Sequence, residues 1–378
     1  MPFEDWSAMS QKREFVRLAL ADGANVSQLC RRFGIGRTSA YKLLQRYREQ
    51  GEAGLAERSR RPRSSPGRTP AALESAALDL RAEHPAWGGR KIARVLSRRG
   101  VGELSPSTVT GILRRNGIEL GALGGGAKPF IRFEHTTPNA LWQMDFKGHV
   151  AMRSGSRVHP LTVLDDHSRF SLVLAACANE TTPTVKAHLV SAFARYGLPW
   201  RIATDNGAPW GDGAGEGFTP LVVWLLEADV AVSHSAPYHP QTLGKDERFH
   251  RSLKAEVLSA PFADLTHAQE AFDRWRDLYN TERPHDALAG GVPIERFAPS
   301  PRDYSDAVMP FEYASDDTLR RVQQKGELSF KGRLVKVSKA FAGKIVALRP
   351  TRTDGIMDIF FRHQKIRTID LHITSVYP

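Results

Sequence analysis

Apolar side chains in the first third of the chain recur at helical spacing, three and four residues apart. A helix is predicted over about 9–20, and Ser27 is a suitable N-cap for a second helix in SQLCRRF. The triplet Gly34-Ile35-Gly36 then supplies a short turn into a third helix. Residues 1–56 therefore have the layout of a helix-turn-helix domain.

The third helix has an apolar face and a polar face. The apolar positions are Ala40, Leu43, Leu44 and Tyr47. The polar positions, which a recognition helix would present to a DNA major groove, are Arg37, Thr38, Ser39, Lys42, Gln45 and Arg46. A plain three-helix bundle with a basic surface is the alternative interpretation.

A second helical unit is predicted over residues 70–120. Apolar repeats mark one helix near 72–80 and another near 92–96. The segment SPSTVTGILRRNG begins with Ser105 as an N-cap and Pro106 at the first helical position, and it ends at a helix-terminating Asn-Gly pair. Two helix-turn-helix units in tandem favour an extended DNA site.

Two segments have the composition of linkers. Residues 57–69, ERSRRPRSSPGRT, hold five arginines in a Pro- and Ser-rich stretch that cannot bury a core. Such an arm, with Arg60, Arg61 and Arg63 at its centre, is either a solvated linker or a minor-groove DNA contact. Residues 121–137 include the flexible run GALGGGA.

Strand-like alternation begins near residue 138. In WQMDFKGHV, apolar and polar positions alternate, and the strands HPLTVLDD and RFSLVLAA flank a hairpin turn at 165–168. Helices at 182–196, near 219–227 and from 244 then alternate with the short strands RIATD and VAVSHS. This order predicts a mixed α/β domain over 138–300. Residues 301–378 return to strand-like runs and are predicted to be a linker and a small basic β domain.

Charge is distributed unevenly along the 378 residues, whose net charge is +12. Residues 1–130 hold 23 Lys and Arg against 12 Asp and Glu, residues 131–309 hold 17 against 22, and residues 310–378 hold 13 against 7. An acidic centre between two basic ends favours a nucleic-acid-binding protein.

The remaining composition limits the class of protein. Cys30 and Cys177 are the only cysteines, so neither a disulfide framework nor a cysteine zinc site is expected. The sequence has no apolar run that would span a bilayer and no signal-peptide pattern. We expect no membrane partner and a cytoplasmic location, associated with the nucleoid when DNA is bound.

Three acids are candidates for chemistry, and each has a simpler interpretation. Asp145 lies on the polar side of its strand and could be an ordinary solvated residue. Asp205 precedes Asn-Gly, a hairpin-turn signal. Glu247, in the helix GKDERFHRSLKAE, is placed to pair with Arg251 one turn later.

The three acids together lie in recognisable motifs. In WQMD, TDNG and HPQTLGKDERFHRSLK the sequence resembles the DDE transposase and retroviral integrase superfamily, and most of all bacterial insertion-sequence transposases with an integrase core. The resemblance covers about 138–298, including YNTERPH. It implies an RNase H-like fold in which Asp145, Asp205 and Glu247 are the catalytic, metal-binding acids. Lys254 matches the family's basic residue on the same helix.

This resemblance implies a reaction. Displacement at a phosphodiester builds negative charge on the attacking and leaving oxygens, and two Mg²⁺ or Mn²⁺ ions about 3.5–4 Å apart can stabilise both. The expected function is a transposase that binds terminal inverted repeats, cleaves a strand at each end and joins the 3′-OH to target double-stranded DNA. Because paired ends must be held together, a homo-oligomer is expected.

Other features qualify the resemblance. The Gly-rich run WGDGAGEGF (210–218) lengthens the interval between Asp205 and Glu247, and no Cys/His zinc module is present. Asp165 and Asp166 are interpreted as turn formers, and Asp246 is left out because it lies nearer the apolar side of its helix. His234, His239 and His250 are interpreted as satisfied polar residues, with His250 and Arg251 on the Glu247 face as phosphate contacts.

Two other functions remain open at this stage. One is a transposase-derived DNA-binding regulator with an inert core. The other is an RNase H-like nuclease that cuts without joining, although tandem helix-turn-helix units suit duplex DNA better than RNA hybrids.

Overall fold

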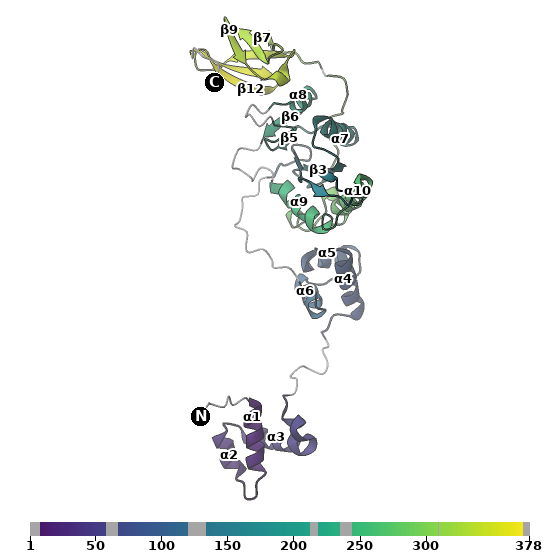
Figure 1. The fold of residues 1–378 in the computed structure, drawn as a ribbon, viewed down its shortest axis with the longest axis vertical. Coiled ribbons are helices and arrows are strands. Elements are labelled where there is room, and N and C mark those ends of the chain that lie inside the picture. The colour runs from purple at the N-terminus through teal and green to yellow at the C-terminus, as the bar shows by residue number, and fades with distance from the viewer. Residues whose placement is uncertain are drawn as a thin grey trace. The chain divides into compact units, whose positions relative to one another are not determined.

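The computed structural model describes residues 8–57, 67–119, 134–211, 218–234, 244–308 and 310–372. The chain forms two compact units, Met1–Arg68 and Thr69–Pro378 (Figure 1). Most of the predicted linkers lie outside the described residues, and so do Arg60, Arg61 and Arg63. No helix in the described ranges is long and apolar enough to cross a membrane.

The first unit is a small helical domain built as the sequence predicts. It contains α1 (Ala8–Ala19), α2 (Val26–Arg32), α3 (Arg37–Gln50) and the 3-10 turn η1 (Gly51–Leu55). Its core consists of Phe15, Val16, Cys30, Ala40, Leu44 and Leu55. The predicted cap at Ser27 is wrong. The side chain of Asn25 accepts the capping bond from the Gln28 amide at 3.1 Å, so α2 begins earlier and Ser27 lies inside its first turn.

The second helical unit consists of α4 (Ala71–Glu83), α5 (Gly89–Arg98) and α6 (Pro106–Arg115). Ser105 caps α6 as predicted, because its hydroxyl accepts from the Thr108 amide at 3.1 Å, and Pro106 occupies the first turn. Helices α5 and α6 pack closely at Gly89. A Cβ there would lie 2.5 Å from the carbonyl oxygen of Pro106, so only glycine allows this approach.

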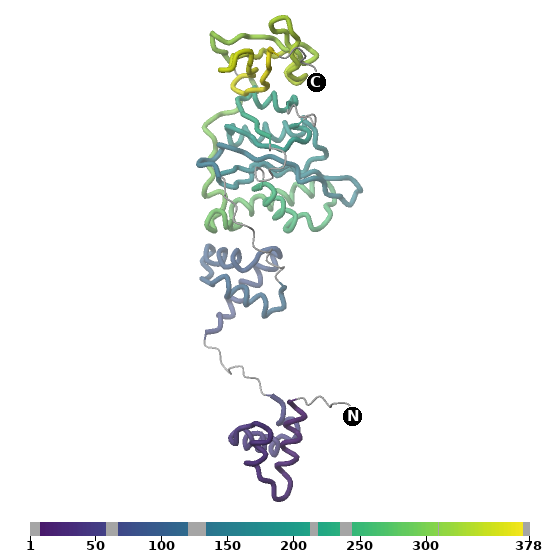
Figure 2. The backbone as a smooth tube through the Cα atoms, turned by 90° about the vertical axis from the view of Figure 1, so that its left-hand side faces the viewer, coloured from purple at the N-terminus to yellow at the C-terminus, as the bar shows by residue number. Residues whose placement is uncertain are grey.

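The central domain is a mixed sheet between helices (Figure 2). The strands are β1 (Trp142–Phe146), β2 (Val150–Ala151), β3 (Arg157–Asp165), β4 (Ser171–Cys177), β5 (Arg201–Thr204) and β6 (Ala231–His234). They lie in the order β2-β3-β1-β5-β6, with β4 paired to β3. The β1–β3 and β3–β4 pairs are antiparallel, whereas β1–β5 and β5–β6 are parallel.

Helices cover both faces of this sheet. On one face α7 (Thr182–Tyr196) and α8 (Pro220–Glu227) share a core with Leu161 and Val163 of β3. On the other face α9 (Gly244–Glu256) and α10 (Leu265–Thr281) pack against Val158 and Leu164 of the same strand. Odd and even positions of β3 therefore point to different cores, as a pleated strand between two helical layers requires. The predicted α/β domain is confirmed.

The C-terminal domain is all β, as predicted. Strands β12 (Gln364–Asp370), β11 (Ile356–Phe361), β10 (Ile345–Pro350) and β7 (Thr318–Arg321) form one antiparallel sheet, and β8 (Glu327–Phe330) pairs with β9 (Arg333–Lys336). This domain packs on the central domain through the rings of Phe218 and Phe341, whose centroids are 5.0 Å apart, and through an ion pair between Lys344 and Glu227.

Candidate active site

Two of the three predicted acids lie on neighbouring parallel strands. Residues Trp142 and Gln143 of β1 pair with Ile202 and Ala203 of β5. Continued by two residues, this register places Asp145 level with Asp205, at the carboxyl ends of both strands. The charge of Asp205 acts on Asp145, and this repulsion together with burial raises the pKa of Asp145 to about 7, with burial as the larger cause.

Each strand acid is held by hydrogen bonds. The Phe146 amide donates to Asp145 at 2.8 Å. Asp205 accepts from the Gly207 amide at 2.9 Å and from the indole of Trp210, which is buried. Trp210 opens the predicted insertion 210–218, so this end of the insertion orients a candidate acid. Asp212 and Glu216, farther along it, lie outside the described residues.

Helix α9 brings a second pair of polar side chains to Asp145. Ligand atoms of Asp145, Asp246 and His250 all lie within 4.8 Å of one another. Asp246 is fully buried and His250 is 7% exposed. The Thr162 hydroxyl, directly across the β1–β3 pair from Asp145, lies 3.1 Å from Oδ1 of Asp246 and 2.8 Å from Nε2 of His250.

His250 lies elsewhere than predicted, and Asp246, which was not predicted as a site residue, lies near Asp145. His250 is turned inward against Thr162, so the prediction that it contacts phosphate from the Glu247 face is wrong. Asp246 does lie on the buried face of α9, as its spacing indicated. That face, however, is polar at this point, because Gln143 and Thr162 of the sheet contact it.

The hairpin acids complete a buried polar network. Asp165 accepts from the Asn139 and Ser168 amides at 2.7 Å each, which confirms its interpretation as a turn former. Asp166 is also buried, and it accepts from the Gln143 amide group at 2.9 Å and pairs with Lys245. Gln143 in turn accepts from the Asp246 amide at 3.3 Å. The start of α9 is therefore tied to β1 and to the hairpin.

Glu247 differs from Asp246 in its surroundings. It is exposed, as are Arg251 and Lys254 one and two turns later on the same side of α9. The structure thus brings Asp145 near Asp205 on one side and near Asp246 on the other, whereas Glu247, the residue after Asp246, is exposed. Burial raises the pKa of Asp246 well above its usual value, with the charge of Asp145 as the next cause.

Burial has the opposite effect on His250. It lowers the pKa of that imidazole to about 3, and the charge of Lys147 adds to the effect. The ring is therefore neutral at physiological pH. With Nε2 facing the Thr162 hydroxyl, Nδ1 lies 3.9 Å from Oδ2 of Asp145, which is too long for a hydrogen bond.

Five family models match this chain in the order of its domains. They are a helix-turn-helix domain (residues 11–63), a homeodomain-like domain (39–113), two integrase core domains (135–240 and 228–293) and the C-terminal domain of IS481 family transposases (317–377). An uncharacterized 31.7 kDa protein of insertion element IS407 from Burkholderia multivorans is 30% identical over 176 residues, 46% of this chain. The chain is therefore similar to insertion-element proteins and to integrase core domains, in the order of its own domains.

The chain spans only part of the length of the relatives that it matches. The chain spans 61% of the length of the IS407 protein. It spans 49% of a 39.2 kDa protein of insertion element IS476 from Xanthomonas euvesicatoria, to which it is 28% identical over 46% of its own length. A Gag-Pro-Pol polyprotein of Mason-Pfizer monkey virus is 33% identical over 122 residues, which are 32% of this chain and 6% of that protein.

Two solved structures align with parts of this chain at low sequence identity and low TM-score. The HTLV-2 integrase catalytic core domain in complex with magnesium aligns with 43% of this chain and 99% of its own, at 16% identity and a TM-score of 0.32. A simian T-cell lymphotropic virus intasome in complex with PP2A regulatory subunit B56 gamma aligns with 76% of this chain and 96% of its own, at 16% identity and a TM-score of 0.36.

The predicted recognition helix is α3 (Arg37–Gln50). Arg37, Thr38, Ser39 and Lys42 are exposed along its first two turns. Arg46 differs from them, because its guanidinium donates to the carbonyl oxygen of Ala56 at 2.5 Å and so helps to hold η1. One of the six side chains predicted to face DNA, Arg46, therefore has a structural role.

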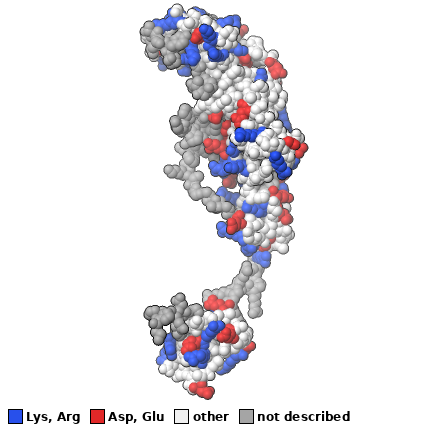
Figure 3. All heavy atoms as spheres, in the orientation of Figure 1, with Lys and Arg blue, Asp and Glu red and all other residues white. Residues whose placement is uncertain are grey.

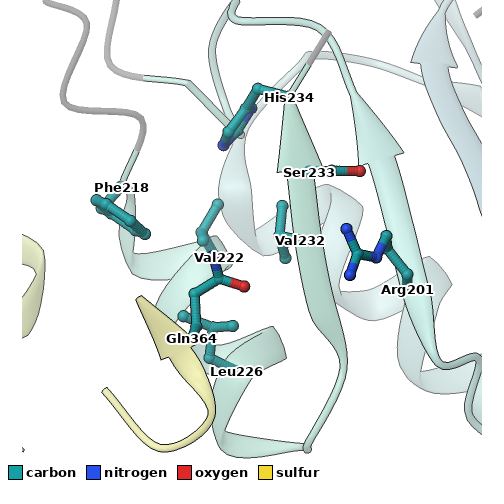
Figure 4. Close-up of a pocket in the computed structure, with 8 residues that line it drawn as sticks. All are labelled: Arg201, Phe218, Val222, Leu226, Val232, Ser233, His234 and Gln364. Carbon is teal, nitrogen blue, oxygen red and sulfur yellow. The ribbon is translucent and has the colours of Figure 1, made fainter. Parts of the chain in front are cut away.

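A cavity of about 300 Å³ lies away from the acids. Its lining is Arg201, Phe218, Val222, Leu226, Val232, Ser233, His234 and Gln364, from the central and C-terminal domains (Figure 4). Its lining residue His234 lies near the site, because its Nδ1 is 2.9 Å from the carbonyl oxygen of Asp205. Among the described residues its Nε2 has no partner. His239 lies outside them.

Proposed function

We propose that this chain is a transposase that binds the terminal inverted repeats of an insertion sequence and carries out DNA strand cleavage and strand transfer. The observation that carries the proposal is the register that sets Asp145 beside Asp205 at the ends of parallel strands, with Asp246 of α9 near Asp145. The helical domains that precede the core supply the DNA-binding part of the same proposal.

The donor set fits a hard divalent cation. Carboxylate oxygens are the ligands that Mg²⁺ and Mn²⁺ prefer. Burial, and after it the charge of Asp205, raises the pKa of Asp145 to about 7, and a bound cation would offset both effects. Asp145, Asp205 and Glu247 would hold the metal, in a two-ion site. Bound there, the ions would stabilise the charge that develops on the attacking and leaving oxygens of the phosphodiester.

We assign the third acid to Glu247 rather than to Asp246. A ligand shared with a DNA phosphate must be accessible, and Glu247 is exposed whereas Asp246 is fully buried. Asp246 already has partners in Thr162 and Gln143, which suits a residue that fixes the first turn of α9. Arg251 and Lys254, on the Glu247 side, would contact DNA phosphates.

The proposed DNA contacts extend to the N-terminal unit. Arg37, Thr38, Ser39 and Lys42 on α3 would enter the major groove, and the arginines of 57–69 would follow the backbone or the minor groove. Basic side chains are also visible on the C-terminal β domain (Figure 3). Because two element ends are processed together, the active species would be a homodimer or a larger assembly.

A strand-transfer assay tests the proposal. Pre-cut duplexes that carry the element's end sequences are incubated with a target plasmid, Mg²⁺ or Mn²⁺, and wild-type or Glu247→Gln protein. The proposal predicts joined product only with wild type and metal, and unchanged end binding by the variant. Bound ends without product at any metal concentration would identify an inert DNA-binding regulator. Cut but unjoined ends would identify a nuclease.

A further inference from the structure

The second helical unit has a basic face whose partly exposed side chains contact the central domain. Helix α5 and its C-cap residue Arg99 carry five basic side chains: Arg90, Lys91, Arg94, Arg98 and Arg99. Arg98 pairs with Glu295 at 2.6 Å and Arg99 pairs with Glu282 at 2.7 Å. Each acid lies more than 180 residues along the chain, in the segment 282–295 that follows α10.

The middle of this contact is closely fitted. The Arg94 guanidinium donates to the carbonyl oxygens of Ala289 at 2.7 Å and of Gly290 at 3.3 Å. Gly290 has a positive φ of 84°, and a Cβ on it would lie 2.6 Å from Nε of Arg94. A glycine at this position therefore serves both the backbone turn and the approach of Arg94. Arg90, 3.4 Å from Asp286, extends the contact at its other end.

Lys91 connects the contact to α9. Its ammonium lies 3.9 Å from Glu256, the last residue of α9, whose side chain is 7% exposed. Glu256 also accepts from Nη2 of Arg283 at 3.0 Å and from the indole of Trp275 on α10 at 2.9 Å. Lys91 therefore contacts the buried cluster that holds the C-terminal end of the helix whose first turn carries Asp246 and Glu247.

The face of the unit that a helix-turn-helix would use for DNA remains accessible. In such a unit the second helix of the pair, here α6, reads the groove. On α6, Ser107 and Arg114 are exposed. The basic side chains of α5 contact acids and carbonyl oxygens of the segment 282–295, whereas on α6 Arg115 pairs with Glu74 of α4 and Arg114 is exposed.

We propose that α5 is a docking helix, which holds the second helix-turn-helix unit on the 282–295 segment and on the end of α9 while α6 binds DNA. This inference rests on the proposed function, because it assigns the contact a role in DNA strand transfer. Binding of an element end by α6 is thereby coupled to the position of the α9 acids. Docking would favour the active arrangement and would persist when DNA is bound.

Charge reversal of one ion pair tests the proposal in the full-length protein. Arg99→Glu and Glu282→Arg each place like charges together, and the double variant restores an opposite-charge pair. Each single variant is expected to lower strand transfer roughly tenfold with end binding within a factor of about two, and the double variant to recover most of the loss. All four side chains at Arg98, Arg99, Glu282 and Glu295 are at least one-third exposed, so the variants should fold.

Two controls separate the explanations. Arg114→Glu on α6 should weaken end binding and should not be rescued by Glu282→Arg. Amide hydrogen exchange of residues 282–296 reports docking without any assay of activity: exchange should increase in each single variant and return to the wild-type rate in the double variant. This readout holds even if wild type shows no strand transfer, so failure of the proposed function does not hide failure of the docking proposal.

Three results would overturn the docking role. Loss of end binding in Arg99→Glu, with no effect of Glu282→Arg and no rescue, would make α5 a DNA-contacting helix. Increased strand transfer in both single variants would make the contact autoinhibitory. Unchanged hydrogen exchange of residues 282–296 in all variants would show that the contact does not form in solution.

Discussion

The two sides of the candidate site are fixed in different ways. Asp145 and Asp205 are placed by β-sheet register, which leaves each residue one position and one direction. The acids of α9 are placed by the rotation of a helix, in which neighbouring residues point about 100° apart. Asp246 consequently lies against Thr162 and Gln143, while Glu247, the next residue, is exposed. The β-sheet register therefore fixes the positions of Asp145 and Asp205. On α9, by contrast, the adjacent acids Asp246 and Glu247 can be told apart only by their surroundings.

The largest effect on strand transfer is expected from substitution of Asp145 or Asp205, the two acids at the strand ends. Asp145→Asn or Asp205→Asn removes a charge from the candidate metal site with almost no change in shape. Strand transfer should fall to background in either variant, while binding of end duplexes stays at the wild-type level. A variant with neither acid should be no worse than either alone, because the groups act as a unit. Retention of more than a few per cent of strand-transfer activity in Asp205→Asn would contradict a shared catalytic role for Asp145 and Asp205.

Removal of the Thr162 hydroxyl should have the next largest effect. Thr162→Val leaves the fully buried Asp246 and the neighbouring His250 without their shared partner. The free energy of unfolding should fall by about 1–3 kcal/mol, measured by urea denaturation of the core. Thr162→Ser, which keeps the hydroxyl, is the matched control and should recover most of this loss. Equal stability of the two variants would contradict the network that links α9 to the sheet.

The pH dependence of metal binding tests whether the Asp145 carboxylate binds the cation. The pKa of Asp145 is raised from 3.8 to about 7, so its ionised form is unfavourable in the metal-free fold. This penalty is complete above pH 7, decreases as pH falls toward 3.8, and is relieved by a cation. Below pH 7 the cation must also displace a proton. Mg²⁺ should therefore raise the melting temperature of the core by several degrees at pH 8 and by less at pH 6.

Asp145→Asn is the control for that measurement. The variant lacks the titrating carboxyl group, so its smaller Mg²⁺-dependent shift should be the same at both pH values. A shift that is larger at pH 6 than at pH 8 in wild type would contradict metal binding at the Asp145 carboxylate.

The smallest expected effect lies in the N-terminal unit. Lys42→Ala on α3 should weaken binding of end duplexes by a few-fold and should lower the slope of log affinity against log salt by about one, as expected for one lost phosphate contact. Arg46→Ala is the contrasting variant. Since Arg46 holds the carbonyl oxygen of Ala56, it should lower the melting temperature of this unit without a comparable change in the salt slope.

Sequence pattern predicted local elements well and long-range partners poorly. The helix predicted at 182–196 is α7 with the same bounds, and Ser105 caps α6 as predicted. Both outcomes depend on neighbours within a few residues. The surroundings of Asp246 depend on Thr162 and Gln143, which are 84 and 103 residues away. An acid on the apolar side of a helix gave no sign of these partners, so the spacing of Phe249 and Leu253 alone suggested leaving it out.

The basic residues of α5 repeat this lesson. Basic side chains on one face of a helix are usually solvated, and nothing in the sequence pattern pairs these with other residues of the chain. Their partners among residues 282–295 come from a segment that the sequence alone does not bring near α5. By contrast, the resemblance carried by WQMD and TDNG already implied that Asp145 and Asp205 share a site, and the parallel register of β1 and β5 places the two acids level.

One comparison tests the central claim most directly: strand transfer by Glu247→Gln against Asp246→Asn, with pre-cut ends, plasmid target and Mg²⁺. Glu247→Gln should bind ends and give no product. Asp246→Asn, which keeps an oxygen for the Thr162 hydroxyl, should retain measurable strand transfer. The reverse result, with product from Glu247→Gln and none from a folded Asp246→Asn protein, would make Asp246 the third catalytic acid and contradict the role assigned to Glu247.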